Sequence, residues 1–235
     1  MEYPNLFLSL WTLNEFEMLK IDNNRKVWIT SDTHYGHTNI CRGVTNWRMP
    51  DGSIPENQTR DFDTLDKMNA AIVNNINEVV GQDDVLIHLG DWSFGGFENI
   101  EEFRNRIICQ EIHLLLGNHD HHIERNRENC QRLFTSVHHF LRLEYQGHSF
   151  EMLHYPITSW NNLRKGRIHL HGHCHLPHHA KISGGRRMDV GMDGHLEFRP
   201  YDFVHEVLNP MLKVPIGSEM GSLDHHTDNM KNIVG

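Results

Sequence analysis

The sequence predicts an α/β fold in which the ends of several strands meet at one functional site. Two observations support this prediction. Short runs of β-type residues alternate with stretches of helical spacing, as in βαβ units. In addition, five of these runs stop at residues that bind metals or transfer protons. One such ending could arise by chance, but five in one chain indicate a shared site, of the kind that open α/β sheets form at the carboxyl ends of their strands.

The central strand-like run covers residues 112–116 and stops at a glycine. An amide, an imidazole and a carboxylate follow, in Gly117-Asn118-His119-Asp120. Turn formation alone would explain Asn118 and Asp120, because both residue types favour turns. The design recurs after residues 26–31, 84–89, 149–153 and 167–170, which lead into Asp32-Thr33-His34, Gly90-Asp91, His154-Tyr155-Pro156 and His171-Gly172-His173-Cys174-His175. Asp32 and His34 stand two residues apart, so an extended backbone would project them to the same side.

The other stretches are expected to form helices, short strands and loops. Residues 64–80 carry apolar side chains at helical spacing, with Asp61 or Asp63 as the N-cap and Gly81 at the C-terminal end. Further elements are expected as an initial helix or strand at 6–13, a helix at 100–109, a charged helix at 124–132, short strands at 134–145 and a returning strand at 188–193. Residues 38–60 lack periodicity, which indicates a loop over the site or a solvated insertion.

Length and composition limit the class of protein. At 235 residues the chain suits one domain, expected at residues 1–215, with a polar flexible tail at 216–235. No segment approaches the ~20 apolar residues of a transmembrane helix, and the N-terminus lacks the features of a signal peptide. Four scattered cysteines favour reduced thiols and a cytoplasmic protein. The net charge of −9 disfavours binding to long duplex nucleic acid, but it allows a phosphate substrate where metal cations are bound.

The residues at the strand ends have the chemistry of a site for two metal ions. Imidazole and carboxylate ligands together suit Mn, Fe, Zn or Ni better than Ca, which prefers oxygen alone. The set that could supply them is Asp32, His34, Asp91, Asn118, His154, His173 and His175. A single histidine is more often a core or surface residue than a ligand, and it is the joint pattern that favours metal binding.

Taken together, these motifs resemble those of the calcineurin-like metallophosphoesterases. The signature of that family is D-x-H, G-D, G-N-H-D/E, a single H and G-H-x-H, in this order. Between residues 27 and 195 the chain contains all five, as Asp32-Thr33-His34, Gly90-Asp91, Gly117-Asn118-His119-Asp120, His154 and Gly172-His173-Cys174-His175. The residues in and around these motifs are also similar to those of the small single-domain bacterial and phage phosphoesterases of this superfamily.

The resemblance implies a fold and a set of roles. The fold is a two-sheet β-sandwich flanked by helices, a four-layer αββα arrangement with a binuclear metal site at the carboxyl ends of the strands. The first metal would be held by Asp32, His34 and His175, the second by Asn118, His154 and His173, and Asp91 would bridge the two. Two divalent ions, with Mn favoured over Fe, Ni and Zn, would generate a bridging hydroxide that attacks phosphorus. His119 is the expected proton donor, and Asp120 either orients it or caps the turn.

Residues around the motifs are candidates for lesser roles. His37, Arg42 and Arg48 are candidate substrate contacts, although a surface loop would explain the two arginines equally well. The other histidines near the strand ends, among them His169 and His171, are expected to support the ligands. Cys174, inside the ligand motif, is expected to fill space.

The expected substrate is a small phosphodiester, such as a nucleotide or a cyclic-nucleotide-like compound. Protein phosphatases of the superfamily carry Asp-Arg-Gly after G-D and a glutamate after G-N-H, whereas this chain has Trp92-Ser93-Phe94-Gly95-Gly96 and Asp120. The repair nucleases of the superfamily add a DNA-binding extension, which neither the length nor the net charge of this chain supports. A phosphomonoesterase or protein phosphatase, or a non-catalytic scaffold of the same fold, are the alternatives. No membrane partner is expected, and the sequence leaves the oligomeric state open.

Overall fold

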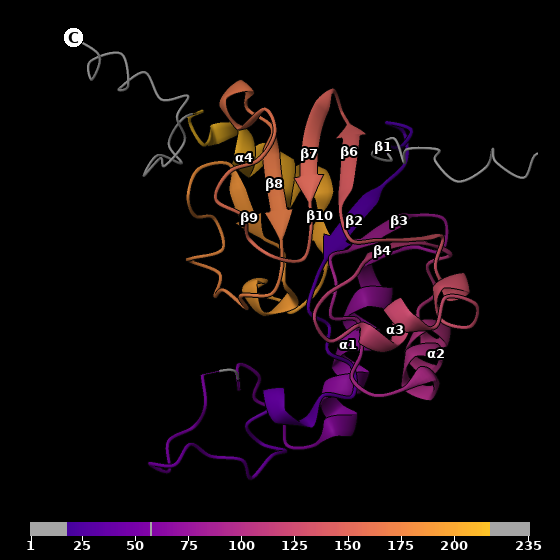
Figure 1. The fold of residues 1–235 in the computed structure, drawn as a ribbon, viewed down its shortest axis with the longest axis vertical. Helices are drawn as coiled ribbons and strands as arrows, with labels where there is room; N and C mark the ends of the chain where they lie inside the picture. Colours follow the sequence, from indigo (N-terminus) through magenta and orange to yellow (C-terminus); the bar gives the residue numbers. More distant parts are fainter. Residues whose placement is uncertain (1–17, 57, 217–235) are drawn as a thin grey trace, which may run out of the picture.

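The computed structural model describes residues 18–56 and 58–216, and it contains two five-stranded sheets with flanking helices (Figure 1). This architecture confirms the predicted two-sheet α/β fold. The element expected at residues 6–13 lies outside the described residues, and so do residues 217–235 of the tail expected at 216–235. Within the described part, no helix is both long and apolar enough to span a membrane.

The first sheet, here called sheet B, has the order β10-β2-β3-β4-β5. Its strands are β2 (Val27–Thr30), β3 (Val85–His88), β4 (Glu111–Leu115), β5 (Ser136–His138) and β10 (Tyr201–Asp202). The strands β2 to β5 are parallel, and β10 joins β2 in the antiparallel sense. Because β2, β3 and β4 run the same way, the residues that follow them emerge at one edge of the sheet.

The second sheet, sheet A, has the order β1-β6-β7-β8-β9. Its strands are β1 (Met18–Lys20), β6 (Leu141–Tyr145), β7 (His148–Met152), β8 (Ile168–His171) and β9 (Arg187–Asp189). A hairpin joins β6 to β7, and the strands β7, β8 and β9 are parallel. The five strand-like runs predicted from sequence are β2, β3, β4, β7 and β8, while β1 and β10 were not predicted.

The structure contains the three predicted helices with different ends, and it also contains an α-helix and a π-helix near the C-terminus that were not predicted. They are α1 (Leu65–Val79), α2 (Phe97–Arg106), α3 (His121–Arg125) and α4 (Asn209–Lys213), with a π-helix at Phe203–Leu208 before α4. The N-cap of α1 is Thr64, whose hydroxyl accepts a hydrogen bond from the Lys67 amide, so the predicted aspartate caps were wrong. The helix α2 begins and ends three residues earlier than predicted. The charged stretch predicted at 124–132 is not a continuous helix: α3 covers only its first two residues, and a short 3-10 helix follows at Gln131–Leu133.

Two apolar clusters hold the layers together. One face of sheet B, with Trp28, Leu86 and Leu114, packs against α1 and α2. Its other face, with Ile29 and Ile87, packs against sheet A and the C-terminal helices. Burial on both faces explains why β2, β3 and β4 read as continuous apolar runs. It also fixes the two sheets relative to each other, and therefore the loops at their ends.

Candidate metal centre

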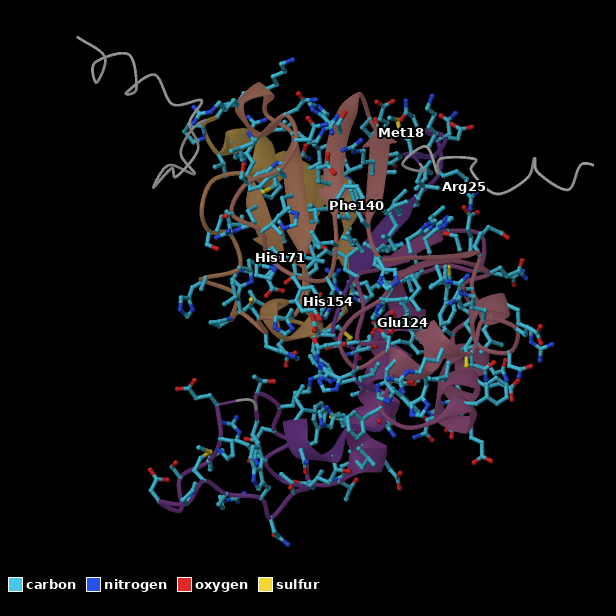
Figure 2. All side chains as sticks on the ribbon, viewed as in Figure 1. Met18, Arg25, Glu124, Phe140, His154 and His171 are labelled. Carbon is cyan, nitrogen blue, oxygen red and sulfur yellow. The ribbon has the colours of Figure 1, made fainter. Side chains whose placement is uncertain are left out.

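The sequence motifs come together in space. They lie in the loops that follow β2, β3 and β4 of sheet B and β7 and β8 of sheet A. Figure 2 labels His154, the residue two positions after β7, in this region, where sheet A meets the loops of sheet B. Within each of two groups, the donor atoms lie within 4.8 Å of one another. One group comprises Asp32, His34 and His175, and the other Asp91, His154 and His173. A third group, His34, Asp91 and His119, shares a member with each of them. The first two groups coincide with the two ligand sets expected from the sequence, apart from Asn118 and the bridging role of Asp91.

Asp91 lies between the two groups. Its Oδ2 atom is 3.4 Å from the Nε2 atoms of both His34 and His154. Asp32 extends the first group, since its Oδ1 atom is 3.8 Å from His34 Nε2 and 3.7 Å from His175 Nε2. A carboxylate oxygen equally distant from two imidazoles of separate clusters has the geometry of a bridging ligand.

The second group is closed by Asn118. Its Oδ1 atom accepts hydrogen bonds from His154 Nε2 at 3.0 Å and from His173 Nδ1 at 2.9 Å. Burial lowers the pKa of His154, but its hydrogen bond to Asp91 and the charges of Asp32 and Asp91 outweigh this and raise the pKa to about 9. The protein thus places positive charge where its donor atoms converge, and a metal cation satisfies the same electrostatic demand.

Hydrogen bonds fix which nitrogen of each imidazole faces the centre. His154 Nδ1 donates to the Leu89 carbonyl at 2.8 Å, and His175 Nδ1 bonds to Asp193 Oδ2 at 2.8 Å. In both cases the Nε2 atom is directed to the site, as in the carboxylate-histidine arrangements of metal proteins. His34 Nε2 is buried and has no hydrogen-bond partner, which would be costly without a ligand. The donor set therefore fits a pair of divalent cations.

Five of the seven candidate ligands have a left-handed backbone. The φ angles are 55° at Asp32, 48° at His34, 56° at Asp91, 70° at His173 and 48° at His175. The prediction that an extended backbone aligns Asp32 with His34 was therefore wrong, although both side chains do reach the site. Such residues cost of order 1–3 kcal/mol each and persist where surrounding contacts enforce them, typically at functional sites.

Asp120 is one of the contacts that enforce this backbone. Its carboxylate accepts hydrogen bonds from the amides of Asp91 at 2.7 Å, Gly117 at 2.8 Å and Trp92 at 3.0 Å. Burial raises its pKa to about 7, and the charge of Asp91 adds to the effect. These bonds support the turn-capping alternative: Asp120 clamps the loops after β3 and β4 onto each other.

Arg60 and Asp193 belong to the site but were not predicted to. The Arg60 guanidinium, 3% exposed, donates to the carbonyls of Asp32 and Thr33 and forms an ion pair with Asp193 at 3.0 Å. Asp193 in turn bonds to His175. The pair thus connects the loop after β2 with the loop after β8. No sequence signal marked either residue, because Arg60 lies in a stretch without periodicity.

Two motif glycines are required by close approach. A Cβ atom at Gly172 would lie 2.0 Å from Ser31 Oγ and 2.3 Å from Asp32 Oδ2, and one at Gly117 would lie 2.2 Å from Asp91 Oδ1. The absence of a side chain lets each loop pass directly over a candidate ligand of the neighbouring strand. The glycines in G-N-H-D and G-H-x-H are therefore part of the site geometry.

His119 and His37 line the centre beside the candidate ligands. The His119 ring lies 5.2 Å from that of His34 and 5.5 Å from that of His37, and its backbone amide donates to Asp91 Oδ1. His37 stacks on Phe94, with ring centroids 4.1 Å apart. Burial and the neighbouring charge of His119 lower the pKa of His37 to about 4, so His37 is neutral at physiological pH.

The two predicted arginines are not among the residues that the structure gathers around the candidate ligands. Arg42 pairs with Asp61 at 3.8 Å, and Arg48 donates to the carbonyls of Thr45 and Trp47 within its own loop. That segment extends away from the sheets below α1 (Figure 1). Their contact with a phosphate stays a prediction. Cys174 is exposed, so the expectation that it fills space was wrong.

Comparison with known proteins identifies the family. Residues 25–209 match the family model described as calcineurin-like phosphoesterase, and the chain belongs to this family. The Gene 66 protein of Mycobacterium phage D29 is 28% identical over 78% of this chain and 96% of its own length. An uncharacterised protein of Methanocaldococcus jannaschii is 29% identical over 66% of this chain and 72% of its own length. Among solved structures, a protein of unknown function from Aquifex aeolicus has a similar fold, with a TM-score of 0.50 and 19% identity over 75% of this chain and 95% of that one.

Proposed function

We propose that this chain is a metal-dependent phosphodiesterase acting on a small nucleotide or cyclic-nucleotide-like substrate. The observation that carries the proposal is the position of Asp91 Oδ2, 3.4 Å from one imidazole of each donor group. Two divalent cations, with Mn favoured, would be held by Asp32, His34 and His175 on one side and by Asn118, His154 and His173 on the other, with Asp91 between. Bound there, they would lower the pKa of a water molecule and neutralise phosphate charge.

The residues of this chain that are not ligands supply positioning and proton transfer. His119 lies beside both groups and is only partly exposed, so it can donate a proton to the leaving oxygen of a bound ester. Asp120 keeps the His119 loop in place through its three backbone hydrogen bonds. Arg60 and Asp193 keep His175 in orientation. In this assignment Asp120, Arg60 and Asp193 are positioning residues.

Aromatic side chains at the rim favour a substrate that contains a base. Phe94 is 40% exposed and its ring lies 5.6 Å from that of His119. Tyr155 is 42% exposed and its ring lies 4.8 Å from that of His173. Exposed rings on two sides of a polar centre offer stacking surfaces to a nucleobase. A cytoplasmic location agrees with the four free cysteines.

The test is a substrate panel on protein stripped by a chelator and reloaded with Mn, Ni or Zn. It should include cyclic nucleotides, dinucleotides, nucleotide monoesters and aryl mono- and diesters. We expect hydrolysis of diesters to exceed that of monoesters, and to vanish without metal. A preference for monoesters would replace the phosphodiesterase assignment by a phosphatase. No hydrolysis of any ester with any of the metals would favour a non-catalytic scaffold.

A further inference from the structure

A second cluster of metal-binding side chains lies outside the seven candidate ligands. It comprises His171, Cys174 and Asp189, whose donor atoms all lie within 4.8 Å of one another. His171 is the last residue of β8 and Asp189 the last of β9, and the two are partners in the parallel register. Cys174 comes from the loop that follows β8. Figure 2 labels His171 at this end of sheet A.

His171, a member of this cluster, has one ring nitrogen without a hydrogen-bond partner. The residue is 1% exposed, and its Nδ1 atom bonds to the Gly172 carbonyl at 2.9 Å. Its Nε2 atom is buried and has no hydrogen-bond partner. A buried polar atom left unpaired destabilises a protein, whereas the same atom is well suited to a metal because the Nδ1 bond fixes the tautomer.

Asp189 adds a buried carboxylate to the cluster. It is 1% exposed, and its Oδ1 atom accepts a hydrogen bond from the Gly191 amide at 2.8 Å. Its Oδ2 atom has a longer contact, 3.3 Å, with the Leu176 amide. A Cβ atom at Gly191 would lie within 3.2 Å of oxygens of both Asp189 and Asp32. Two carboxylates thus lie close together in a buried region, which favours a nearby cation.

Cys174 distinguishes this cluster from the binuclear centre. The candidate ligands of that centre offer only nitrogen and oxygen, whereas Cys174 offers sulfur and is exposed enough to exchange a metal. Thiolate together with imidazole selects Zn²⁺ over Mn²⁺ or Mg²⁺. Three protein ligands leave one position of a tetrahedral zinc ion for water.

We propose that His171 Nε2, Cys174 Sγ and the Asp189 carboxylate bind a third divalent cation, Zn²⁺, next to the binuclear centre. Cys174 lies in sequence between His173 and His175, so a zinc ion bound to it restrains the loop that carries one candidate ligand of each metal. The zinc site is separate from the proposed hydrolysis, and the test of zinc binding does not depend on which substrate the protein hydrolyses.

Cobalt substitution of the full chain tests this proposal, because only a thiolate ligand gives Co²⁺ a sulfur-to-metal charge-transfer band in the near ultraviolet. We expect stripped wild-type protein to bind three equivalents of Co²⁺ and to show this band. Cys174→Ser should lose the band and one equivalent and keep the other two. Asp189→Asn, which retains an acceptor for the Gly191 amide, should also lose one equivalent.

Cys109→Ser is the matched control. Cys109 is buried and bonds to the carbonyls of Asp84 and Glu111, contacts that a serine hydroxyl can also make, so this variant should keep the band and all three equivalents. The proposal is overturned if wild-type protein shows no charge-transfer band, or if Cys174→Ser keeps it. Zinc content after competitive dialysis should follow the same pattern, with one equivalent lost only from the Cys174 and Asp189 variants.

Discussion

The two sheets contribute differently to the candidate centre. The loops of sheet B supply both carboxylates and the amide, as Asp32, Asp91 and Asn118, together with one imidazole, His34. The loops of sheet A supply three imidazoles, from His154, His173 and His175. The formal negative charge that attracts cations therefore comes from one sheet, while the other completes the two groups with imidazoles.

The two sets of loops are also held in place differently. On the side of sheet B, backbone hydrogen bonds join Asp32 N to Gly90 O and His34 N to Asp91 O, and Asp120 clamps the same region. On the side of sheet A, the loops are held in place more by side-chain contacts, chiefly the hydrogen bond between Asp193 and His175. Loss of a carboxylate ligand on the side of sheet B should therefore remove charge and metal, whereas loss of a supporting contact on the side of sheet A should loosen the ligand geometry and weaken the binding of one metal.

The largest effect is expected for Asp91→Asn. Asparagine keeps the shape but removes the charge between the two groups, so metal content should fall and activity with it. Two-metal stabilisation contributes several kcal/mol to the transition state, so a loss of about 10³-fold or more in kcat/KM is expected. Metal analysis and a diester assay measure both effects, and circular dichroism checks that the variant is folded. Retention of full activity would remove Asp91 from the bridging role.

His119→Ala separates catalysis from metal binding on the side of sheet B. We expect kcat to fall by about 10²–10⁴-fold, because general acid catalysis is lost, while metal content is unchanged. The loss should be smaller for an aryl ester, whose leaving group needs no proton, than for an alkyl ester. His122→Ala, an exposed neighbour, is the control. If the His119 variant loses metal, His119 is a ligand and not the proton donor.

Asp193→Asn examines the support on the side of sheet A. The change weakens the hydrogen bond that orients His175 and the ion pair with Arg60, so the affinity for one metal should fall by about 10–100-fold. With saturating metal, activity should recover most of its wild-type value. Titration of the stripped protein with Mn²⁺ measures the affinity. An unchanged affinity would mean that His175 is held by its own loop and that the two sheets support their ligands alike.

The strands and the order of the motifs could be predicted from the sequence because both are local. Because β3 and β4 are buried on both faces, their sequences are apolar runs. Each run is followed directly by the polar residues of its motif. The left-handed backbone at Asp32, His34 and Asp91 could not be predicted, since it is imposed by hydrogen bonds between loops distant in sequence. Arg60 escaped prediction for the same reason: its partner Asp193 is more than a hundred residues away.

Helix ends were less predictable than strands. Thr64 and not an aspartate caps α1, because the side chain that reaches the Lys67 amide depends on the angle at which the loop enters the helix. The brief strand β10 and the π-helix at Phe203–Leu208 carry weak periodicity, and they are stabilised by packing against β2 and sheet A. These elements form because of tertiary contacts, and no local sequence pattern predicts them.

The smallest effect is expected at His169, a buried histidine of sheet A that binds no candidate ligand. Its Nδ1 atom donates to the Glu151 carbonyl, and its Nε2 atom accepts from the Ile157 amide. Burial lowers its pKa to about 4. The folded state therefore disfavours the protonated form, and stability present above pH 6.5 is lost as the pH falls from 6.5 towards 4.

His169→Gln tests this contribution, because glutamine can both donate to Glu151 and accept from Ile157 but cannot titrate. Between pH 7 and pH 5, the wild type should lose about 2 kcal/mol more unfolding free energy than the variant. Urea unfolding of chelator-treated protein at the two pH values measures the difference. The same change at His179, which is exposed, should leave the pH dependence unaltered. Equal losses in wild type and His169→Gln would show that the imidazole is protonated as easily in the folded chain as in the unfolded one, and that sheet A tolerates charge on its outer face.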